Sequence, residues 1–265
     1  MFVLKSDGRK ERFDKEKIVR TCLRAHASEK MAREIADYIE KNTKEGMTTH
    51  AVYRMVIDEL DRRKSKSSIF LTLRDAVADI GPEQFELYAK KILESNGYKV
   101  RWNQIIQGKV IEHQVDLVAE IGGKKFLVEC KRHFNPHRFC GLEVCLQVQA
   151  RLEDIIDGFH AGRNSDNFSG AWIFTNSKFS EHAKKYAHGK NFRMTGWRYE
   201  GDIALDSLIE KNKMYPVTIL KTDIVVKRKL LNANILTIQD ALENEKRLLK
   251  KGMKDVVTQA RSLVI

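Results

Sequence analysis

The chain has 265 residues, of which 42% are hydrophobic and 32% are charged, and it contains 3 prolines. This composition excludes a disordered or collagen-like protein, and the length is enough for two or three small domains. No apolar run approaches the ~20 residues that a membrane-spanning helix needs, and the first residues lack the apolar core of a signal peptide, so we expect a cytoplasmic protein. The 4 cysteines are too few for a disulfide scaffold in a chain of this length.

The net charge of +12, from 48 Lys and Arg against 36 Asp and Glu, indicates a polyanionic partner such as a nucleic acid. The excess is uniform along the chain, because residues 1–80 carry 18 basic and 14 acidic groups, residues 81–200 carry 18 and 14, and residues 201–265 carry 12 and 8. Many basic proteins bind no nucleic acid, and an even distribution does not show which part of this chain would bind.

Residues 1–79 are predicted to form a mostly helical domain with a small β-hairpin. Asp7-Gly8 indicates a turn between two short strands, and Gly81-Pro82 ends the series of helices that follows. Residue types that cap helix N-termini precede the apolar-periodic segments, at Asp14, at Ser28 and at Thr48 or Thr49.

Residues 80–213 are predicted to form an α/β domain, because strand-like and helix-like segments alternate there. The region after residue 213 is predicted to be helical, which gives a third segment over 214–265. The strands are expected at 98–102, 112–121, 124–131, 170–175 and 191–197, and the helices at 83–96, at 142–159 and after Ser180.

Two carboxylates are predicted to face each other on a hairpin in this domain. If Gly122-Gly123 is a two-residue turn, Ile121 pairs with Lys124, and the same register brings Asp116 opposite Glu129. Their Cβ atoms would then be about 5 Å apart. Lys131, two residues beyond Glu129, shares the face of that carboxylate.

Opposed carboxylates repel each other unless a cation lies between them, and Mg²⁺ binds a few carboxylates together with water molecules. A neighbouring lysine suits metal-assisted hydrolysis of a phosphodiester. A solvated strand face with alternating charges is the alternative. The apolar run Phe126–Val128 favours a central strand and therefore the functional interpretation.

Four segments of this region stand in a distinctive order. They are a helix and strand from Gly81-Pro82-Glu83-Gln84-Phe85-Glu86 to Gly97-Tyr98-Lys99-Val100, an acidic strand Val115–Val118, the strand Leu127-Val128-Glu129-Cys130-Lys131-Arg132, and Ile173–Ser180 with Ala183 and Tyr186-Ala187. Together they resemble the Mrr-like branch of the PD-(D/E)XK restriction endonuclease superfamily. The resemblance covers roughly residues 81–200 and implies a restriction-endonuclease-like fold and a DNA endonuclease that uses Mg²⁺ or Mn²⁺.

The resemblance implies a role for each candidate residue of the nuclease site. Asp116, Glu129 and the carbonyl of Cys130 would bind the metal, and Glu86 would complete the acidic set. Lys131 would orient the attacking water and stabilise the developing charge. Either Gln147 or Gln149 would take the position of a glutamine found in related enzymes, and a plain surface role is the alternative for both.

Several histidines and cysteines near this segment have both a structural and a functional interpretation. Members of the Mrr branch usually have small residues just before the metal-binding aspartate, where this chain has Glu112-His113-Gln114-Val115. We expect His113 to be structural, and entry of its side chain into the site is the alternative. The series His133, His137, Cys140 and Cys145 has zinc-type ligands, but its spacing matches no common zinc site. We expect a loop followed by a helix that buries Cys145.

Two segments of residues 1–65 form a recognisable pattern, Val3–Ile18 and Gly46-Met47-Thr48-Thr49-His50-Ala51-Val52-Tyr53. They resemble the ATP-cone, the nucleotide-binding regulatory module of ribonucleotide reductases and their repressors. It implies ATP or dATP as a regulatory ligand, with Lys5 and Lys17 on the phosphates. A small helical domain without nucleotide is the alternative, and Ser6 stands where the family often has a basic residue. The implied contacts are Val3, Lys5, Arg9, Glu11, Asp14, Lys17, Thr49 and Tyr53.

In the C-terminal region, Lys227–Ile238 and Lys250–Arg261 resemble a helix-hairpin-helix DNA-binding module. Asn234 stands where such a hairpin usually has glycine, and a helical cap or a dimerisation element is an equal alternative. We expect a DNA endonuclease that forms a homo-oligomer, a dimer, and responds to nucleotide. The alternatives are a nucleotide-responsive DNA-binding protein without nuclease activity and a nuclease for branched DNA.

Overall fold

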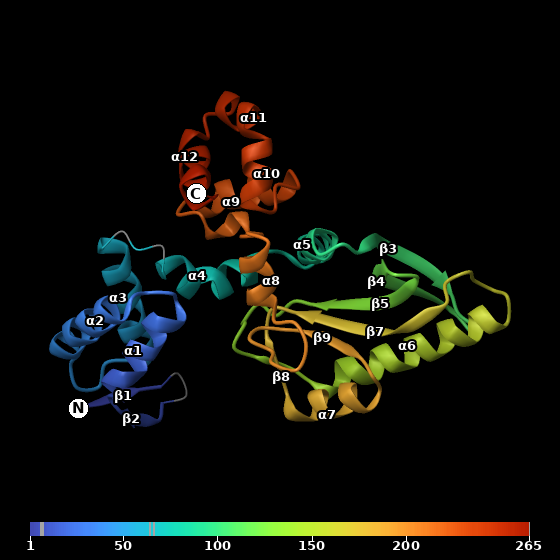
Figure 1. The fold of residues 1–265 in the computed structure, drawn as a ribbon, viewed down its shortest axis with the longest axis horizontal. Helices are drawn as coiled ribbons and strands as arrows, with labels where there is room; N and C mark the ends of the chain where they lie inside the picture. The colour runs from blue at the N-terminus through green and yellow to red at the C-terminus, as the bar shows by residue number, and fades with distance from the viewer. Residues whose placement is uncertain (6–7, 64, 66, 265) are drawn as a thin grey trace. The chain divides into compact units, whose positions relative to one another are not determined.

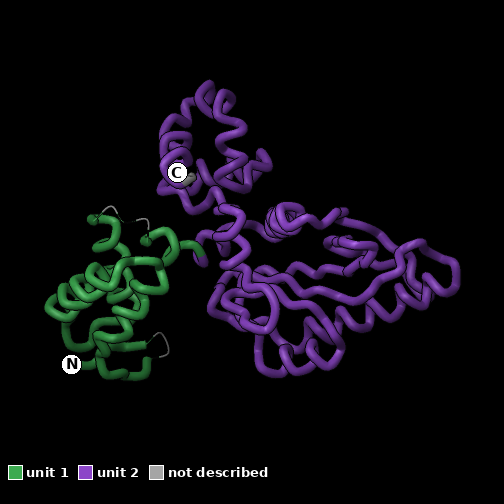
Figure 2. The backbone as a smooth tube through the Cα atoms, in the orientation of Figure 1, with its two compact units in different colours: residues 1–73 green, residues 74–265 purple. Residues whose placement is uncertain are grey.

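The computed structural model describes residues 1–5, 8–63, 65 and 67–264, and it divides into two compact units, residues 1–73 and 74–265 (Figure 2). Ser6 and Asp7, and with them the predicted Asp7-Gly8 turn, lie outside the described residues. None of the helices in the described ranges combines the length and hydrophobicity that a bilayer crossing requires.

The first unit is a helical domain that carries a small antiparallel hairpin, as predicted. Strand β1 (Phe2–Leu4) pairs with β2 (Lys10–Arg12), and helices α1 (Lys15–Arg24), α2 (Glu29–Asn42), α3 (Thr49–Arg62) and the start of α4 (Ser67–Ala78) follow. The side chains of Asp14, Ser28 and Thr48 accept backbone N–H groups at the starts of α1, α2 and α3. Thr48, and not Thr49, therefore caps the third helix. Fully buried side chains from three helices form the core: Cys22, Ile35, Ile39, Val56 and Leu60.

The second unit is built on a five-stranded mixed sheet, which confirms the α/β class (Figure 1). The strand order is β3 (Lys99–Gln107), β4 (Glu112–Ile121), β5 (Lys124–Lys131), β7 (Phe168–Thr175) and β9 (Arg193–Thr195). The first two pairs are antiparallel and the last two are parallel. A short parallel pair, β6 (Phe139–Cys140) with β8 (Lys178–Phe179), was not predicted from the sequence.

Helices cover both faces of this sheet because its central strands are apolar on both sides. Along β7, Ala171 and Ile173 join the core beneath α6 (Leu142–His160) and α7 (Glu181–Gly189). Phe174 points to the opposite face, where its ring lies 6.0 Å from that of Phe85 on α5 (Pro82–Ser95). Because successive side chains of β7 point to opposite faces of the sheet, this strand contributes to the apolar core on both faces.

The C-terminal part of the second unit is helical, as predicted, and is bonded to the rest of that unit. It contains α8 (Leu205–Lys211), a short turn η1 (Val217–Ile219), α9 (Ile224–Asn232), α10 (Ile238–Glu243), α11 (Glu245–Lys250) and α12 (Lys254–Val264). The Tyr88 hydroxyl on α5 donates to the carbonyl of Met214 at 2.5 Å, and Lys91 pairs with Asp240 at 2.8 Å. These contacts make the C-terminal helices part of the unit that carries the sheet.

Gly158 on α6 tests how closely this helix packs against the sheet. A Cβ placed there would lie 2.6 Å from the backbone of Gly108, at the turn after β3. We expect Gly158→Ala to lower the free energy of unfolding by about 1–3 kcal/mol, because backbone cannot move aside as a side chain can. Urea unfolding measures the change. Gly189→Ala is the matched control, since nothing lies within 4 Å of its Cβ position, and it should leave stability unchanged or raise it. Equal effects of the two substitutions would contradict the packing argument.

Candidate active site and nucleotide pocket

The sheet is interrupted around Asp116. Pairing of β3 with β4 runs from Lys99–Glu120 to Trp102–Leu117 and resumes at Gln104–Val115, so Asn103 and Asp116 are skipped. Asn103 has a φ of 50°, outside the extended region. On the other side, β4 and β5 pair in the predicted register from Ile121–Lys124 only as far as Leu117–Val128. The predicted pair of Asp116 with Glu129 is therefore not part of the ladder.

Beyond the last backbone pair of β4 and β5, a hydrogen bond to the Asp116 side chain connects the two strands. The carboxylate accepts the backbone N–H of Cys130 at 2.8 Å. A side chain of β4, and not its backbone, thus satisfies the donor of β5 at this point. Because the N–H and C=O of one residue in a strand point to the same side, the Cys130 carbonyl also faces the Asp116 side.

The surroundings of Asp116 disfavour its ionised form. Burial and the nearby charge of Glu129 raise the pKa of Asp116 to about 7, with a smaller contribution from Glu86, although the hydrogen bond from the Cys130 N–H favours the ionised form. Neighbouring carboxylates and burial both disfavour that form. A divalent cation would reverse this, which makes the acidic set a chemically suitable place for one.

Glu86 is fixed by a residue that the sequence did not single out. The indole N–H of Trp102 on β3 donates to the Glu86 carboxylate at 2.9 Å. Burial raises the pKa of Glu86, the Trp102 hydrogen bond opposes this, and the charges of Glu83 and Glu129 add to it. The structure thus brings together the carboxylates of Glu86, Asp116 and Glu129, which come from α5, β4 and β5.

Arg151 on α6 is a second residue that sequence reasoning missed. Its guanidinium pairs with the Glu129 carboxylate, and both side chains are largely buried. Gln147 lies one helical turn before Arg151 and shares its face of α6, whereas Gln149 is hydrogen-bonded to Glu153 on its own helix. Of the two candidate glutamines, Gln147 is therefore the one on the side of α6 that faces Glu129.

Lys131 ends β5 and is exposed, and it makes no ion pair with any residue that the structure describes. Glu129 and Lys131 share a face of the strand, as predicted. Within the described ranges, no group of three or more His, Cys, Asp or Glu side chains has the geometry of a metal site. The donor set that remains is two carboxylates and a carbonyl, which suits Mg²⁺ because this ion keeps several waters.

His113, Cys140 and Cys145 make contacts within the fold. His113 Nε2 lies 2.8 Å from the Asp154 carboxylate on α6, so it is a satisfied structural residue, as expected. Cys140 and Cys145 are free and buried in the core beneath α6, and the Cys145 thiol donates to the carbonyl of Ala183. The zinc interpretation is not supported by these positions.

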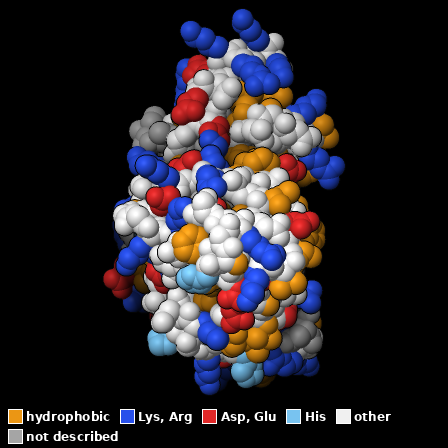
Figure 3. Space-filling model, turned by 90° about the vertical axis from the view of Figure 1, so that its right-hand side faces the viewer, with side chains coloured by type: hydrophobic (Ala, Val, Ile, Leu, Met, Phe, Trp, Pro, Cys, Tyr) orange, Lys and Arg blue, Asp and Glu red, His pale blue; other side chains and the backbone are white. Residues whose placement is uncertain are grey.

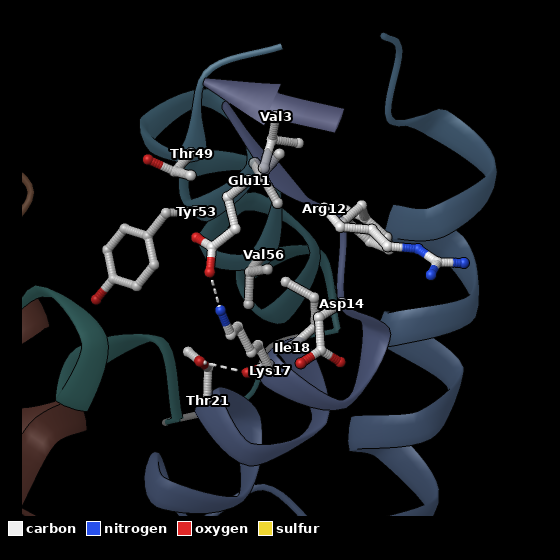
Figure 4. A pocket seen from close by; sticks show the side chains of 12 residues that line it. Val3, Glu11, Arg12, Asp14, Lys17, Ile18, Thr21, Thr49, Tyr53 and Val56 are labelled. Carbon is white, nitrogen blue, oxygen red and sulfur yellow. Dashed lines mark hydrogen bonds and ion pairs between the residues drawn. The ribbon is translucent and has the colours of Figure 1, made fainter. Parts of the chain in front are cut away.

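A pocket in the first unit lies where the ATP-cone resemblance predicts nucleotide contacts. It holds about 590 Å³, part of it open to solvent. Figure 4 shows the Glu11 carboxylate and the Lys17 ammonium facing each other in it, with Thr49 and Tyr53 to one side and Asp14 to the other. Six of the eight predicted contacts line this pocket, and the residues that the sequence did not indicate are Arg12, Phe13, Ile18, Thr21, Val52 and Val56.

The charges in this pocket are internally paired. Glu11 forms ion pairs with Lys17 and, at 3.3 Å, with Lys5. Hydrogen bonds from Lys17 and Lys5 lower the pKa of Glu11. Lys5 thus reaches the pocket through Glu11 without lining it, and Arg9 is exposed and absent from the lining. One carboxylate oxygen of Asp14 accepts the backbone N–H of Glu16 at the start of α1.

The C-terminal helices carry a cluster of basic side chains, and Figure 3 shows Lys and Arg gathered at that end of the molecule. Asn234 and Gly252 have φ values of 56° and 74° and join α9 to α10 and α11 to α12. Asn234 thus adopts the left-handed conformation that glycine favours, which asparagine tolerates. The exposed cations of α11 and the start of α12, which form no ion pair within the described residues, are Lys246, Arg247, Lys250, Lys251 and Lys254.

Two family models match the chain. The ATP cone domain matches residues 1–69, and a restriction endonuclease domain of the Mrr catalytic type matches residues 77–199. An uncharacterized protein of Archaeoglobus fulgidus is 33% identical over 180 residues, which are 66% of this chain and 98% of the relative. A second uncharacterized protein of that organism is 54% identical over 39 residues, 15% of this chain and 83% of that protein.

The fold of a solved protein is also similar. A crystal structure of a protein of unknown function superposes with a TM-score of 0.59 at 32% identity, covering 69% of this chain and 98% of the other.

The raised pKa of Asp116 predicts a pH-dependent stability in chelator-treated protein. Since the folded pKa, about 7, exceeds the ordinary value of 3.8, Asp116 contributes stability that is complete below pH 4 and is lost as the pH rises through 7. A pKa difference of one unit between the folded and unfolded states corresponds to about 1.4 kcal/mol of stability. Asp116→Asn should therefore raise the free energy of unfolding at pH 8 by at least about 1 kcal/mol, and the gain should shrink towards pH 4.5.

The matched control for this measurement is Asp154→Asn. Although burial opposes it, hydrogen bonds from His113 and from the backbone of Val110 and Ile111 lower the pKa of Asp154. Its carboxylate therefore contributes stability above its unfolded pKa, and the substitution should destabilise the protein at pH 8. An Asp116→Asn variant that is less stable than wild type at pH 8 would contradict the electrostatic argument.

Proposed function

We propose that this chain, which belongs to the family of Mrr-type restriction endonucleases and carries an ATP-cone domain, hydrolyses phosphodiester bonds of DNA with Mg²⁺ or Mn²⁺ and is regulated by ATP or dATP. The observation that carries the proposal is the Asp116 carboxylate bound to the Cys130 N–H where β4 stops pairing with β5, with Glu129 and Glu86 near enough to raise its pKa. The intact set of acidic residues and Lys131 favours an enzyme over a DNA-binding protein that has lost its activity.

In this mechanism, Asp116, Glu129 and the Cys130 carbonyl would hold a divalent ion. Such an ion, when bound, would supply Lewis-acid stabilisation of the phosphate and activation of water. The Cys130 N–H orients the Asp116 carboxylate, and Trp102 holds Glu86 in place. Lys131, exposed at the end of β5, positions the attacking water and stabilises the developing negative charge. Arg151 neutralises Glu129 while no cation is bound.

In this proposal, binding of the regulatory nucleotide breaks the ion pairs of Glu11. The two lysines that would bind phosphate are both paired with Glu11, so a triphosphate must take them over from that carboxylate. Apolar side chains of the same pocket, among them Phe13, Ile18 and Val52, can contact the base. Branched DNA shares the cleavage chemistry and is the alternative substrate, and a homodimer remains part of the proposal.

Cleavage of plasmid DNA tests the nuclease assignment. We expect the wild type to cut supercoiled, nicked, branched or methylated DNA with Mg²⁺, and chelator to stop the reaction. Lys131→Ala and Asp116→Asn should each slow cleavage at least about 100-fold, because they remove the water-positioning group and a metal ligand. Lys124→Ala, at the exposed other end of β5, is the control and should cut normally. Wild-type rates in both site variants would refute the assignment.

Nucleotide binding by the full chain tests the regulatory half. Calorimetry should show saturable binding of ATP or dATP that Lys17→Ala weakens, because a charge-assisted phosphate contact is lost. Lys15→Ala is the matched control on the same helix, since Lys15 pairs with Glu40 at 3.0 Å and with Asp37 and does not line the pocket. No heat at millimolar nucleotide, or equal losses in both variants, would count against the ATP-cone proposal.

Binding of DNA should also involve the C-terminal basic cluster. Replacing Lys246, Arg247, Lys250 and Lys251 by Gln should weaken binding and flatten its salt dependence, because each phosphate contact contributes about −0.9 to the log–log slope. Truncation is a poorer test, since Tyr88 and Lys91 bond to the C-terminal region. An unchanged affinity and slope would assign these helices to packing or dimerisation.

A further inference from the structure

The segment that follows Lys131 combines basic and aromatic residues without any acid. Residues 131–140 read Lys-Arg-His-Phe-Asn-Pro-His-Arg-Phe-Cys. Phe134 is 82% exposed and Phe139 is 57% exposed, although each carries a large apolar ring. A Phe that is so exposed gains little from the fold of its own chain, and its surroundings carry the charge that suits a polyanion.

Asn176 and Arg132 fix the beginning of this loop. The Asn176 side chain accepts the N–H of His133 at 2.7 Å and donates to the carbonyl of the same residue at 2.8 Å. Arg132 donates to the carbonyls of Ile80 and Ala78 at 2.8 and 2.9 Å, at the C-terminal end of α4. These four bonds tie the residues on the N-terminal side of Phe134 to two other elements of the second unit.

The other side of the loop is fixed as well. Arg74 donates to the carbonyl of Pro136, which is buried, and lies 3.2 Å from the ring of His137. The Asn135 side chain accepts the N–H of His137 at 3.0 Å. Phe134 is thus presented to solvent by a framework that is bonded before and after it, and the Arg132 guanidinium lies 5.6 Å from its ring centroid.

The distance along the chain relates Phe134 to the candidate site. Phe134 stands three positions after Lys131, so their Cα atoms are at most about 11 Å apart. DNA held with a phosphate at Lys131 therefore brings the bases next to the cleaved bond within reach of the Phe134 ring. Aromatic side chains stack on exposed bases whatever their sequence, and they enter between bases where stacking is already weakened.

We propose that Phe134 is a specificity-determining residue that stacks on an unpaired or unstacked base beside the cleaved phosphate. The preferred substrate is then DNA with a bulge, mismatch or branch near the cut, and not a fully paired duplex. This inference rests on the proposed function, because it takes DNA as the ligand and Lys131 as the position of the cleaved phosphate.

Fluorescence anisotropy tests the inference with two labelled DNAs, a paired duplex and the same duplex with a one-adenine bulge, in Ca²⁺ to prevent cleavage. We expect the full-length wild type to bind the bulged DNA more tightly. Phe134→Ala should weaken binding of the bulged DNA about 5- to 100-fold and change binding of the paired duplex less than about 2-fold. Phe134→Trp should retain the preference, and Ile105→Ala, at a residue that is 75% exposed on β3, should behave as wild type.

Replacing the bulged adenine by 2-aminopurine gives a direct reading of stacking. Its fluorescence should change on binding of wild type and of Phe134→Trp, but not of Phe134→Ala. Equal affinities of wild type and Phe134→Ala for bulged DNA, or equal losses on both DNAs, would overturn the inference while leaving the nuclease assignment intact. A wild type that neither binds nor cuts any DNA would instead overturn the proposed function and the inference with it.

Discussion

The hydrogen bond from the Cys130 N–H to the Asp116 carboxylate is the contact on which the candidate nuclease site depends. It lies where β4 loses its backbone pairing to both neighbours, so a side chain completes the sheet in place of a carbonyl. This fixes the carboxylate beside β5 and leaves the Cys130 carbonyl on the same side.

The acidic side chains around Asp116 are kept close together by contacts with other parts of the fold. Burial and the charges of Glu129 and Glu86 all oppose ionisation of Asp116, so the acidic set is electrostatically unfavourable by itself. Trp102 and Arg151 limit that cost by binding Glu86 and Glu129, one from the edge strand and one from the long helix α6. Stability and proposed function are therefore opposed at this point, a compromise common at sites that bind cations or react.

In the pocket of the first unit the charges are reversed: lysines that would bind an anion surround a single carboxylate. Two lysines suited to phosphate are both paired with one carboxylate, Glu11, and the pair with Lys17 joins β2 to α1. Replacement of that carboxylate by a phosphate group would change the contacts between β2 and α1. A regulatory role for the domain is consistent with this exchange, because an ion pair that a ligand must break links binding to the arrangement of the hairpin.

The sequence by itself determined the local features: the caps at Asp14, Ser28 and Ser180, the Gly122-Gly123 hairpin with its register, and the α/β class, because these follow from turn chemistry and periodicity. It also indicated most of the pocket lining through the resemblance to the ATP-cone. Only the tertiary structure decided that Arg151 meets Glu129, that Trp102 meets Glu86, and that Asn176 fixes the loop bearing Phe134. Each of these contacts joins residues 16 to 43 positions apart, and no local pattern specifies which helix or strand will lie against another.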